Sequence, residues 1–183
     1  MSEFNLKLEI IRVFIGRWSL FFIYCAFIYI SLPFAPKFWE VILKAFGEGA
    51  RDFPYLVGFL IFINIIFMFL LLKKRKPFKG LLLICLVFFA GFIIMRNLEF
   101  LAERMHLLEY IILPFIIFKS INRQQSKESM HFKILLIGFI VGAIDEIIQR
   151  FIPGRVFDIK DIFLNAASVS LGQVLLYTLK HLS

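Results

Sequence analysis

Ionisable side chains lie inside apolar segments in the C-terminal half of this chain, where they could do acid–base chemistry. An ionisable group inside a membrane helix costs about 2.5 to 3.5 kcal/mol on insertion scales, so each such group calls for a reason. The clearest case is Glu146, which is one to two turns inside an apolar segment and directly follows a second acid, Asp145. If the protein is an enzyme, we predict that Glu146 is a general acid or base and that His106 is its partner.

The spacing of the polar residues places them on single faces of three expected helices. At 100° per residue, one sector of about 100° holds five residues of the segment 133–149. These residues are Gly138, Gly142, Asp145, Glu146 and Gln149. The same arithmetic gives two further polar faces, one with Asp161, Asn165, Ser168 and Gly172, the other with His106, Glu109 and Tyr110.

These three faces are expected to meet near one surface of the membrane. If the N-terminus is cytoplasmic, the polar positions lie within about two helical turns, on the order of 10 Å, of the outer surface. A turn at Pro153-Gly154 would then position Arg155 and Asp158 beside these polar positions. We predict one ligand-binding cluster there, formed by Tyr110, Asp145, Gln149, Arg155, Asp158, Asp161 and Asn165.

Structural roles stay open for several of these residues. Gly138-x-x-x-Gly142 is a spacing that lets two helices approach closely, with no chemistry implied. Asp161 could cap the helix that it begins. Glu146 could form an ion pair with Arg155 or Arg104.

Composition decides which elements must carry these faces. Hydrophobic residues make up 61% of the 183 positions, against about 45–50% in ordinary globular proteins, and 25 Phe lie in long apolar runs. We predict an all-α fold, a polytopic transmembrane helical bundle with about six spans in a single membrane domain over 1–183. The expected spans are 14–34, 54–72, 79–95, 105–118, 133–149 and 162–180. The fourth is short, contains Pro114, and either crosses the membrane or re-enters it.

The distribution of charge predicts the orientation and the class of partner. With both termini cytoplasmic, more Lys and Arg residues lie on the inner side than on the outer side, as the positive-inside rule requires. The net charge of +8 therefore indicates a lipid bilayer partner and no nucleic acid. The basic run at 73–79 is interpreted as a topology anchor that could also bind anionic lipid.

The sequence contains no recognised cofactor or metal motif. Cys25 and Cys85 lie in apolar runs, where a thiol behaves as a small hydrophobe, so we expect no disulfide. There is no H-E-x-x-H and no G-x-S-x-G. The acids of the cluster and His106 could together hold a divalent ion, but we predict no metal and no cofactor.

The polar residues resemble the pattern of a known family. The residues that carry the resemblance, over about 100–175, are His106-x-x-x-Tyr110, Gly142-x-x-Asp145-Glu146-x-x-Gln149, Pro153-Gly154-Arg155, Asp158-x-x-Asp161, Asn165 and Gly172. They resemble the VanZ-like family of bacterial membrane proteins. Where a second glycine is expected after Asn165, this chain has Ala166-Ala167-Ser168. The resemblance implies a multi-pass protein of the bacterial cytoplasmic membrane, in a family whose founding members are linked to low-level resistance to teicoplanin. It implies no established reaction.

Four functions are compatible with these residues. The first is a non-catalytic envelope protein that binds an anionic or lipid-linked envelope precursor at the outer leaflet, with Arg155 on the headgroup. The second is an intramembrane hydrolase or transferase acting on a lipid-linked substrate through Glu146 and His106. The third, a transporter with Glu146 as the carrier, lacks an inverted repeat. The fourth is a structural subunit with a membrane protein partner.

Overall fold

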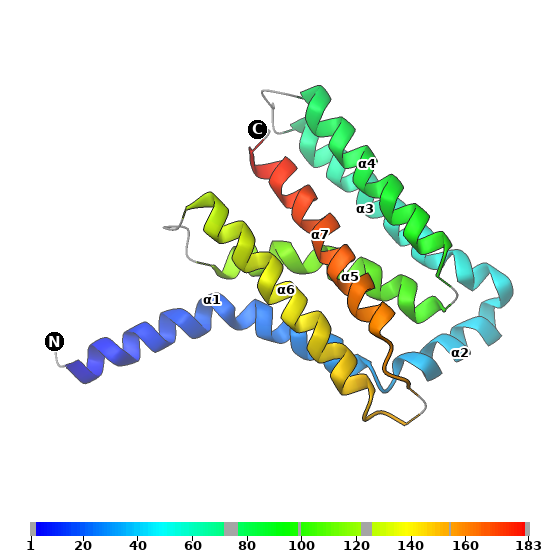
Figure 1. Ribbon diagram of the computed structural model, residues 1–183, viewed down its shortest axis with the longest axis horizontal. Helices are drawn as coiled ribbons and strands as arrows, with labels where there is room; N and C mark the ends of the chain where they lie inside the picture. Colours follow the sequence, from blue (N-terminus) through cyan, green and yellow to red (C-terminus); the bar gives the residue numbers. More distant parts are fainter. Residues whose placement is uncertain (1–2, 72–76, 99, 122–125, 154, 182–183) are drawn as a thin grey trace.

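The computed structural model describes residues 3–71, 77–98, 100–121, 126–153 and 155–181. These residues form seven α-helices and one 3₁₀ helix, with no strand among them (Figure 1). The elements are α1 (Glu3–Ser31), α2 (Ala35–Phe46), η1 (Gly47–Asp52), α3 (Phe53–Leu71), α4 (Pro77–Arg96), α5 (Leu101–Ser120), α6 (Lys127–Gln149) and α7 (Ile159–His181). The prediction of an all-helical protein is confirmed.

In the described part of the chain, fewer helices than predicted meet the length and composition expected of a membrane span. Among the described residues, three helical segments are long and apolar enough to cross a membrane: Gly49–Leu71, Pro77–Arg96 and Ile159–Lys180. A fourth is possible if Ile15–Ser31 and α2, which meet at a 68° bend, count as one broken span. Helices do occupy the two other predicted segments, as α5 and α6. Because both carry charged residues along their length, they are not among the candidate spans, and the prediction of about six spans is not confirmed.

The helix α2 was not expected from the sequence, which placed residues 35–46 in a connection. Pro36 lies in its first turn, where a missing N–H costs nothing, and Gly47 ends it with a positive φ of 64°. The helix is two-faced, and none of its twelve residues, all of which the structure describes, is buried. It therefore lies on the surface of the bundle beside the end of α1 (Figure 1).

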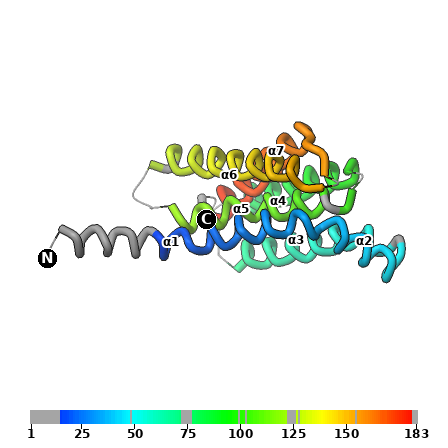
Figure 2. The backbone as a smooth tube through the Cα atoms, turned by 90° about the horizontal axis from the view of Figure 1, so that it is seen from below, coloured from blue at the N-terminus to red at the C-terminus, as the bar shows by residue number. Residues whose placement is uncertain are grey.

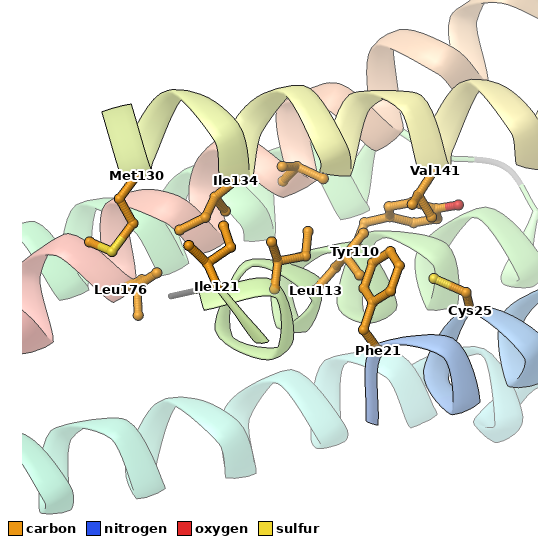
Figure 3. Close-up of a cluster of buried hydrophobic side chains, with 11 residues drawn as sticks. Phe21, Cys25, Tyr110, Leu113, Ile121, Met130, Ile134, Val141 and Leu176 are labelled. Carbon is orange, nitrogen blue, oxygen red and sulfur yellow. The ribbon is translucent and has the colours of Figure 1, made fainter. Parts of the chain in front are cut away.

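The centre of the bundle is formed by α5 and α7. Helix α7 packs against α4, α5 and α6, and α5 also contacts α1, α2 and α3. The buried side chains between α1, α5 and α6 include Phe21, Leu113 and Ile134 (Figure 3). Pro114 does not interrupt α5, which runs without a break from Leu101 to Ser120.

Two glycines allow the closest approaches between these helices. A Cβ at Gly172 would lie 2.1 Å from the backbone oxygen of Ile111, so the backbone of α7 lies directly against the backbone of α5 here. A Cβ at Gly138 would lie 2.6 Å from Cγ1 of Val169, across the α6–α7 contact. Small residues at helix contacts are typical of membrane bundles, and the packing role considered for Gly138 is supported.

The polar ends of the helices share one end of the bundle. The last turn of α6 and the first turns of α5 and α7 lie together, close to α2, and the opposite ends of α6 and α7 lie away from them (Figures 1 and 2). This shared end is the arrangement expected from the polar stripes. Most of the basic run at 73–79, predicted as a topology anchor, lies outside the described residues.

Candidate functional site

The predicted polar residues come together at this end of the bundle, where they form what we call the polar cluster. Helix α5 contributes three of them, α6 three, the connection before α7 two, and α7 two. The members are His106, Glu109, Tyr110, Asp145, Glu146, Gln149, Arg155, Asp158, Asp161 and Asn165. Gly154, predicted to shape the turn before Arg155, lies outside the described residues.

Asp145 lies at the centre of the polar cluster and is fully buried. Its Oδ2 accepts a hydrogen bond from the side-chain amide of Gln149 at 3.3 Å and lies 3.8 Å from Nδ1 of His106. Its Oδ1 is buried and has no hydrogen-bond partner among the described residues. Leaving a buried acceptor unsatisfied costs about 1–3 kcal/mol, so this oxygen is suited to a further polar partner.

Glu146 is also buried, and both of its carboxylate oxygens are occupied. Oε1 accepts from Nε2 of Gln149 at 2.9 Å, and Oε2 accepts from the backbone N–H of Asp158 at 3.3 Å. Glu146 therefore ties the end of α6 to the connection that follows. Neither Arg104 nor Arg155 forms an ion pair with it in the described part of the chain; Arg104 donates instead to backbone oxygens at Leu98 and Arg51.

His106 lies between two carboxylates. Its Nδ1 is 3.4 Å from Oε2 of Glu109, one turn later on α5, and 3.8 Å from Oδ2 of Asp145 on α6. The His106 side chain is 13% exposed and that of Glu109 is 22% exposed, so this edge of the polar cluster is partly accessible. The ring nitrogen forms no hydrogen bond of adequate geometry within the described residues, so its contacts with the two carboxylates are electrostatic.

Several buried polar atoms of the polar cluster have no hydrogen-bond partner among the described residues, and we call these the open polar atoms. They are Nδ1 of His106, the hydroxyl of Tyr110, Oδ1 of Asp145, and Nε and Nη2 of Arg155. Across the described residues, only one further buried side-chain atom is in this state, Oε1 of Gln173. Native proteins satisfy the large majority of buried polar groups, so their concentration in one place indicates a site that takes a partner.

Asn165 and Asp158 stabilise the helices, because their side chains form hydrogen bonds with helix backbone groups. The side-chain amide of Asn165 donates to the backbone oxygen of Gly142 at 3.4 Å, and a Cβ at Gly142 would lie 2.8 Å from Cβ of Asn165. These two residues thus hold α6 against α7. Oδ1 of Asp158 accepts from the backbone N–H of Lys160 at 2.8 Å and so caps α7, the role that the sequence suggested for Asp161. Asp161 is half-buried in the first turn of α7 and interacts electrostatically with Arg155.

A groove of about 480 Å³ adjoins the polar cluster and was missed by the sequence reasoning. Its walls come from the end of α1, from α2, from the start of α3 and from α5, and it is lined by Phe27, Ser31, Leu32, Phe34, Ala35, Phe38, Trp39, Phe53, Met105, His106 and Glu109. We call it the chain groove. Apolar residues at every fourth position, Phe34, Phe38, Ile42 and Phe46, are the signal that could have indicated an amphipathic helix at α2.

No group of three or more His, Cys, Asp or Glu side chains within the described residues could hold a metal ion. The carboxylates of the polar cluster are instead engaged by Gln149, by a backbone N–H and by His106. What the arrangement offers chemically is a set of hydrogen-bond donors and acceptors that face one another across three elements, with an apolar groove beside them.

The chain was compared with known proteins. A family profile described as VanZ/LLP1 matches residues 20–180. No curated protein and no solved structure matches the chain. The match confirms the resemblance seen in the polar residues and extends it over the first helices, which the motifs did not cover. With apolar helices long enough to cross a membrane, this chain is a multi-pass membrane protein and belongs to the VanZ/LLP1 family.

Proposed function

We propose that this protein is a non-catalytic component of the bacterial envelope that binds the headgroup of a lipid-linked or cell-wall-related ligand at the outer leaflet of the cytoplasmic membrane. Binding would change the amount of that ligand that glycopeptides can reach, and it would therefore change the susceptibility of the cell to teicoplanin. The observation that carries the proposal is the concentration of open polar atoms in the polar cluster. Each is a donor or acceptor whose burial costs free energy until a ligand satisfies it.

Arg155 is the group that would bind an anionic part of the headgroup. Two of its nitrogens, Nε and Nη2, are among the open polar atoms, and they are one edge of the planar guanidinium. Two parallel N–H groups on one edge match the two oxygens of a carboxylate or phosphate. The hydroxyl of Tyr110 interacts with the carboxylate of Asp145, but no hydrogen bond of strict geometry satisfies it or Oδ1 of Asp145 within the described residues, so the pair offers a donor and an acceptor at one place.

The excess of carboxylates over basic groups in the polar cluster limits the class of headgroup that could bind there. The polar cluster contains five carboxylates, on Glu109, Asp145, Glu146, Asp158 and Asp161, against one arginine. A headgroup with negative charge alone would be repelled by this excess. We therefore expect a headgroup that combines an anionic group for Arg155 with hydroxyl or amine donors for the carboxylates, as a phosphorylated sugar or an amino-acid-bearing lipid does.

The experiment compares Arg155→Ala with Arg150→Ala. Arg150 is exposed at the end of α6, outside the polar cluster, so it controls for the loss of one positive charge. In cells that carry each variant, teicoplanin susceptibility and the lipids that co-purify with the protein are measured at equal protein level. Arg155→Ala should lose both the bound lipid and the susceptibility phenotype, and Arg150→Ala neither. Unchanged lipid and unchanged susceptibility in Arg155→Ala would refute the proposal.

A second function, an intramembrane hydrolase or transferase on a lipid-linked substrate, is favoured by one observation. His106 lies between the carboxylates of Glu109 and Asp145, at 3.4 and 3.8 Å, and lines the accessible groove. A histidine oriented by a carboxylate is a typical general base. Glu146 is a weaker candidate for this role than predicted, because both of its oxygens accept hydrogen bonds. Turnover of a lipid-linked precursor by purified protein, lost in His106→Gln, would favour the enzyme.

A further inference from the structure

We propose that the chain groove binds the hydrocarbon chain of a lipid whose headgroup occupies the polar cluster. The inference rests on the proposed function for the headgroup, and it adds that the ligand is a membrane lipid and not a water-soluble wall precursor. It also assigns a function to α2, a helix that no motif of the family resemblance includes.

The walls of the chain groove suit an alkyl or isoprenoid chain. Leu32, directly after α1, is fully buried, and the ring centroid of Trp39 on α2 lies 6.3 Å from that of Phe53 at the start of α3. The volume, about 480 Å³, lies within the range of small-molecule sites, about 300–1,000 Å³. A polar precursor in this place would leave the aromatic walls without apolar contacts, whereas a hydrocarbon chain would cover them.

The polar end of the chain groove joins it to the polar cluster. His106 and Glu109 line the groove, and Nδ1 of His106 is 3.8 Å from the buried carboxylate of Asp145. The two sites therefore share His106 as a common wall. A ligand that fits both must be apolar along its length and polar at one end, which is the description of a lipid.

The rim of the chain groove gives such a lipid a way in from the bilayer. Phe34 is 65% exposed and Phe38 is 55% exposed, although both line the groove. Helix α2 turns away from α1 by 68° and lies on the surface at the same end of the bundle as the polar cluster (Figures 1 and 2). Aromatic side chains of this kind lie at the level of lipid headgroups in membrane proteins. A chain can thus enter sideways beneath α2.

The first test uses Trp39 as a reporter. The chain has two tryptophans, so Trp18→Phe leaves Trp39 alone. This variant is placed in phosphatidylcholine nanodiscs and titrated with octadecyl phosphoethanolamine, whose headgroup joins a phosphate to an amine and whose chain carries bromine at its middle, because bromine quenches tryptophan on contact. The proposal expects saturable quenching at low mole fraction. Quenching that rises only linearly, as with chain-brominated phosphatidylcholine, would overturn it.

The second test fills the groove. Ala35 lines the chain groove, and Val41 is exposed on the same helix outside that lining, so Ala35→Phe and Val41→Phe add the same ring at matched positions. Native mass spectrometry measures how much octadecyl phosphoethanolamine each protein retains. Ala35→Phe should retain about tenfold less than Val41→Phe, the effect of losing a few methylene contacts. Equal retention would overturn the proposal; if Ala35→Phe does not fold, the Trp39 titration decides alone.

A third comparison separates this inference from the proposed function. Octadecanol has the chain without the phosphate, and Arg155→Ala removes the group that would bind the phosphate. If Ala35→Phe weakens binding while octadecanol binds as well as octadecyl phosphoethanolamine and Arg155→Ala changes nothing, the chain site stands and the headgroup proposal fails. If Arg155→Ala weakens binding and Ala35→Phe does not, the headgroup proposal stands and the chain site fails.

Discussion

The side-chain nitrogen of Gln149 lies 2.9 Å from Oε1 of Glu146 and 3.3 Å from Oδ2 of Asp145. One amide thus donates to two adjacent buried carboxylates, one turn earlier on the same helix. Two acids side by side in an apolar helix repel each other and lose their hydration, and a shared donor offsets part of both costs. Gln149 therefore positions the acids of the polar cluster.

Replacing Gln149 by Leu should lower the stability of the purified protein. The change leaves Oε1 of Glu146 and Oδ2 of Asp145 without the donor of Gln149, at a cost of about 1–3 kcal/mol for a buried group. The melting temperature in detergent is the measurement, with Arg150→Leu at the exposed neighbouring position as the control. If the two variants melt together, Gln149 does not hold the acids in place.

Replacing Gly172 by Ala should be far more damaging than its size suggests. The new Cβ would lie 2.1 Å from the backbone oxygen of Ile111, and a backbone atom of α5 cannot move aside without shifting the helix. We expect a loss of about 1–3 kcal/mol or more and a lower protein level in membranes. Gly16→Ala is the matched control, because nothing lies within 4 Å of the Cβ that it would add. Equal levels of the two variants would contradict the close approach of α5 and α7.

The contact between Gly138 and Val169 predicts a rescue. Gly138→Ala alone would bring a Cβ within 2.6 Å of Cγ1 of Val169, so it should destabilise the protein. Val169→Ala removes that atom and leaves the Cβ of residue 169 at 3.4 Å from the added Cβ, which is van der Waals contact. The double variant should therefore be more stable than Gly138→Ala, a favourable coupling of about 0.5–3 kcal/mol in a double-mutant cycle. Additive effects would mean that α6 and α7 do not pack in this register.

Glu146→Gln should accumulate normally in the membrane. With its amide oxygen in the place of Oε1, the new side chain still accepts from Nε2 of Gln149, which keeps its hydrogen bond to Asp145, so the one hydrogen bond lost is the longer one from the backbone N–H of Asp158. Protein level and teicoplanin susceptibility are measured together against wild type. A normal level with a lost phenotype would place the charge of Glu146 in the function, whereas a lost protein would make its role structural.

Cysteine labelling tests the proposed outward direction of the polar cluster. Lys160 is exposed at the start of α7, beside the polar cluster, and Glu128 is exposed at the start of α6, at the other end. In a background of Cys25→Ala and Cys85→Ala, a membrane-impermeant maleimide should label Lys160→Cys in intact cells and Glu128→Cys only after permeabilisation. The reverse pattern would place the polar cluster on the cytoplasmic side.

The sequence by itself determined the described α-helices other than α2, and which faces of α5, α6 and α7 are polar. Apolar runs and the rotation of 100° per residue are local properties, so they place Gly142, Asp145, Glu146 and Gln149 on one face without knowledge of any neighbour. They also bring the polar ends of α5, α6 and α7 to one end of the bundle, because helices joined by short connections alternate in direction. Both expectations agree with the structure.

Only the tertiary structure decided what each polar atom contacts. Glu146 accepts from the backbone of Asp158, twelve residues later, and Asn165 donates to Gly142 on another helix. Such pairs depend on distances between helices, which the packing of whole faces sets and no local pattern contains. The same reason explains why the chain groove was missed: α2 is short, and its lining function exists only because a 68° bend brings Phe38 and Trp39 against α1 and α5.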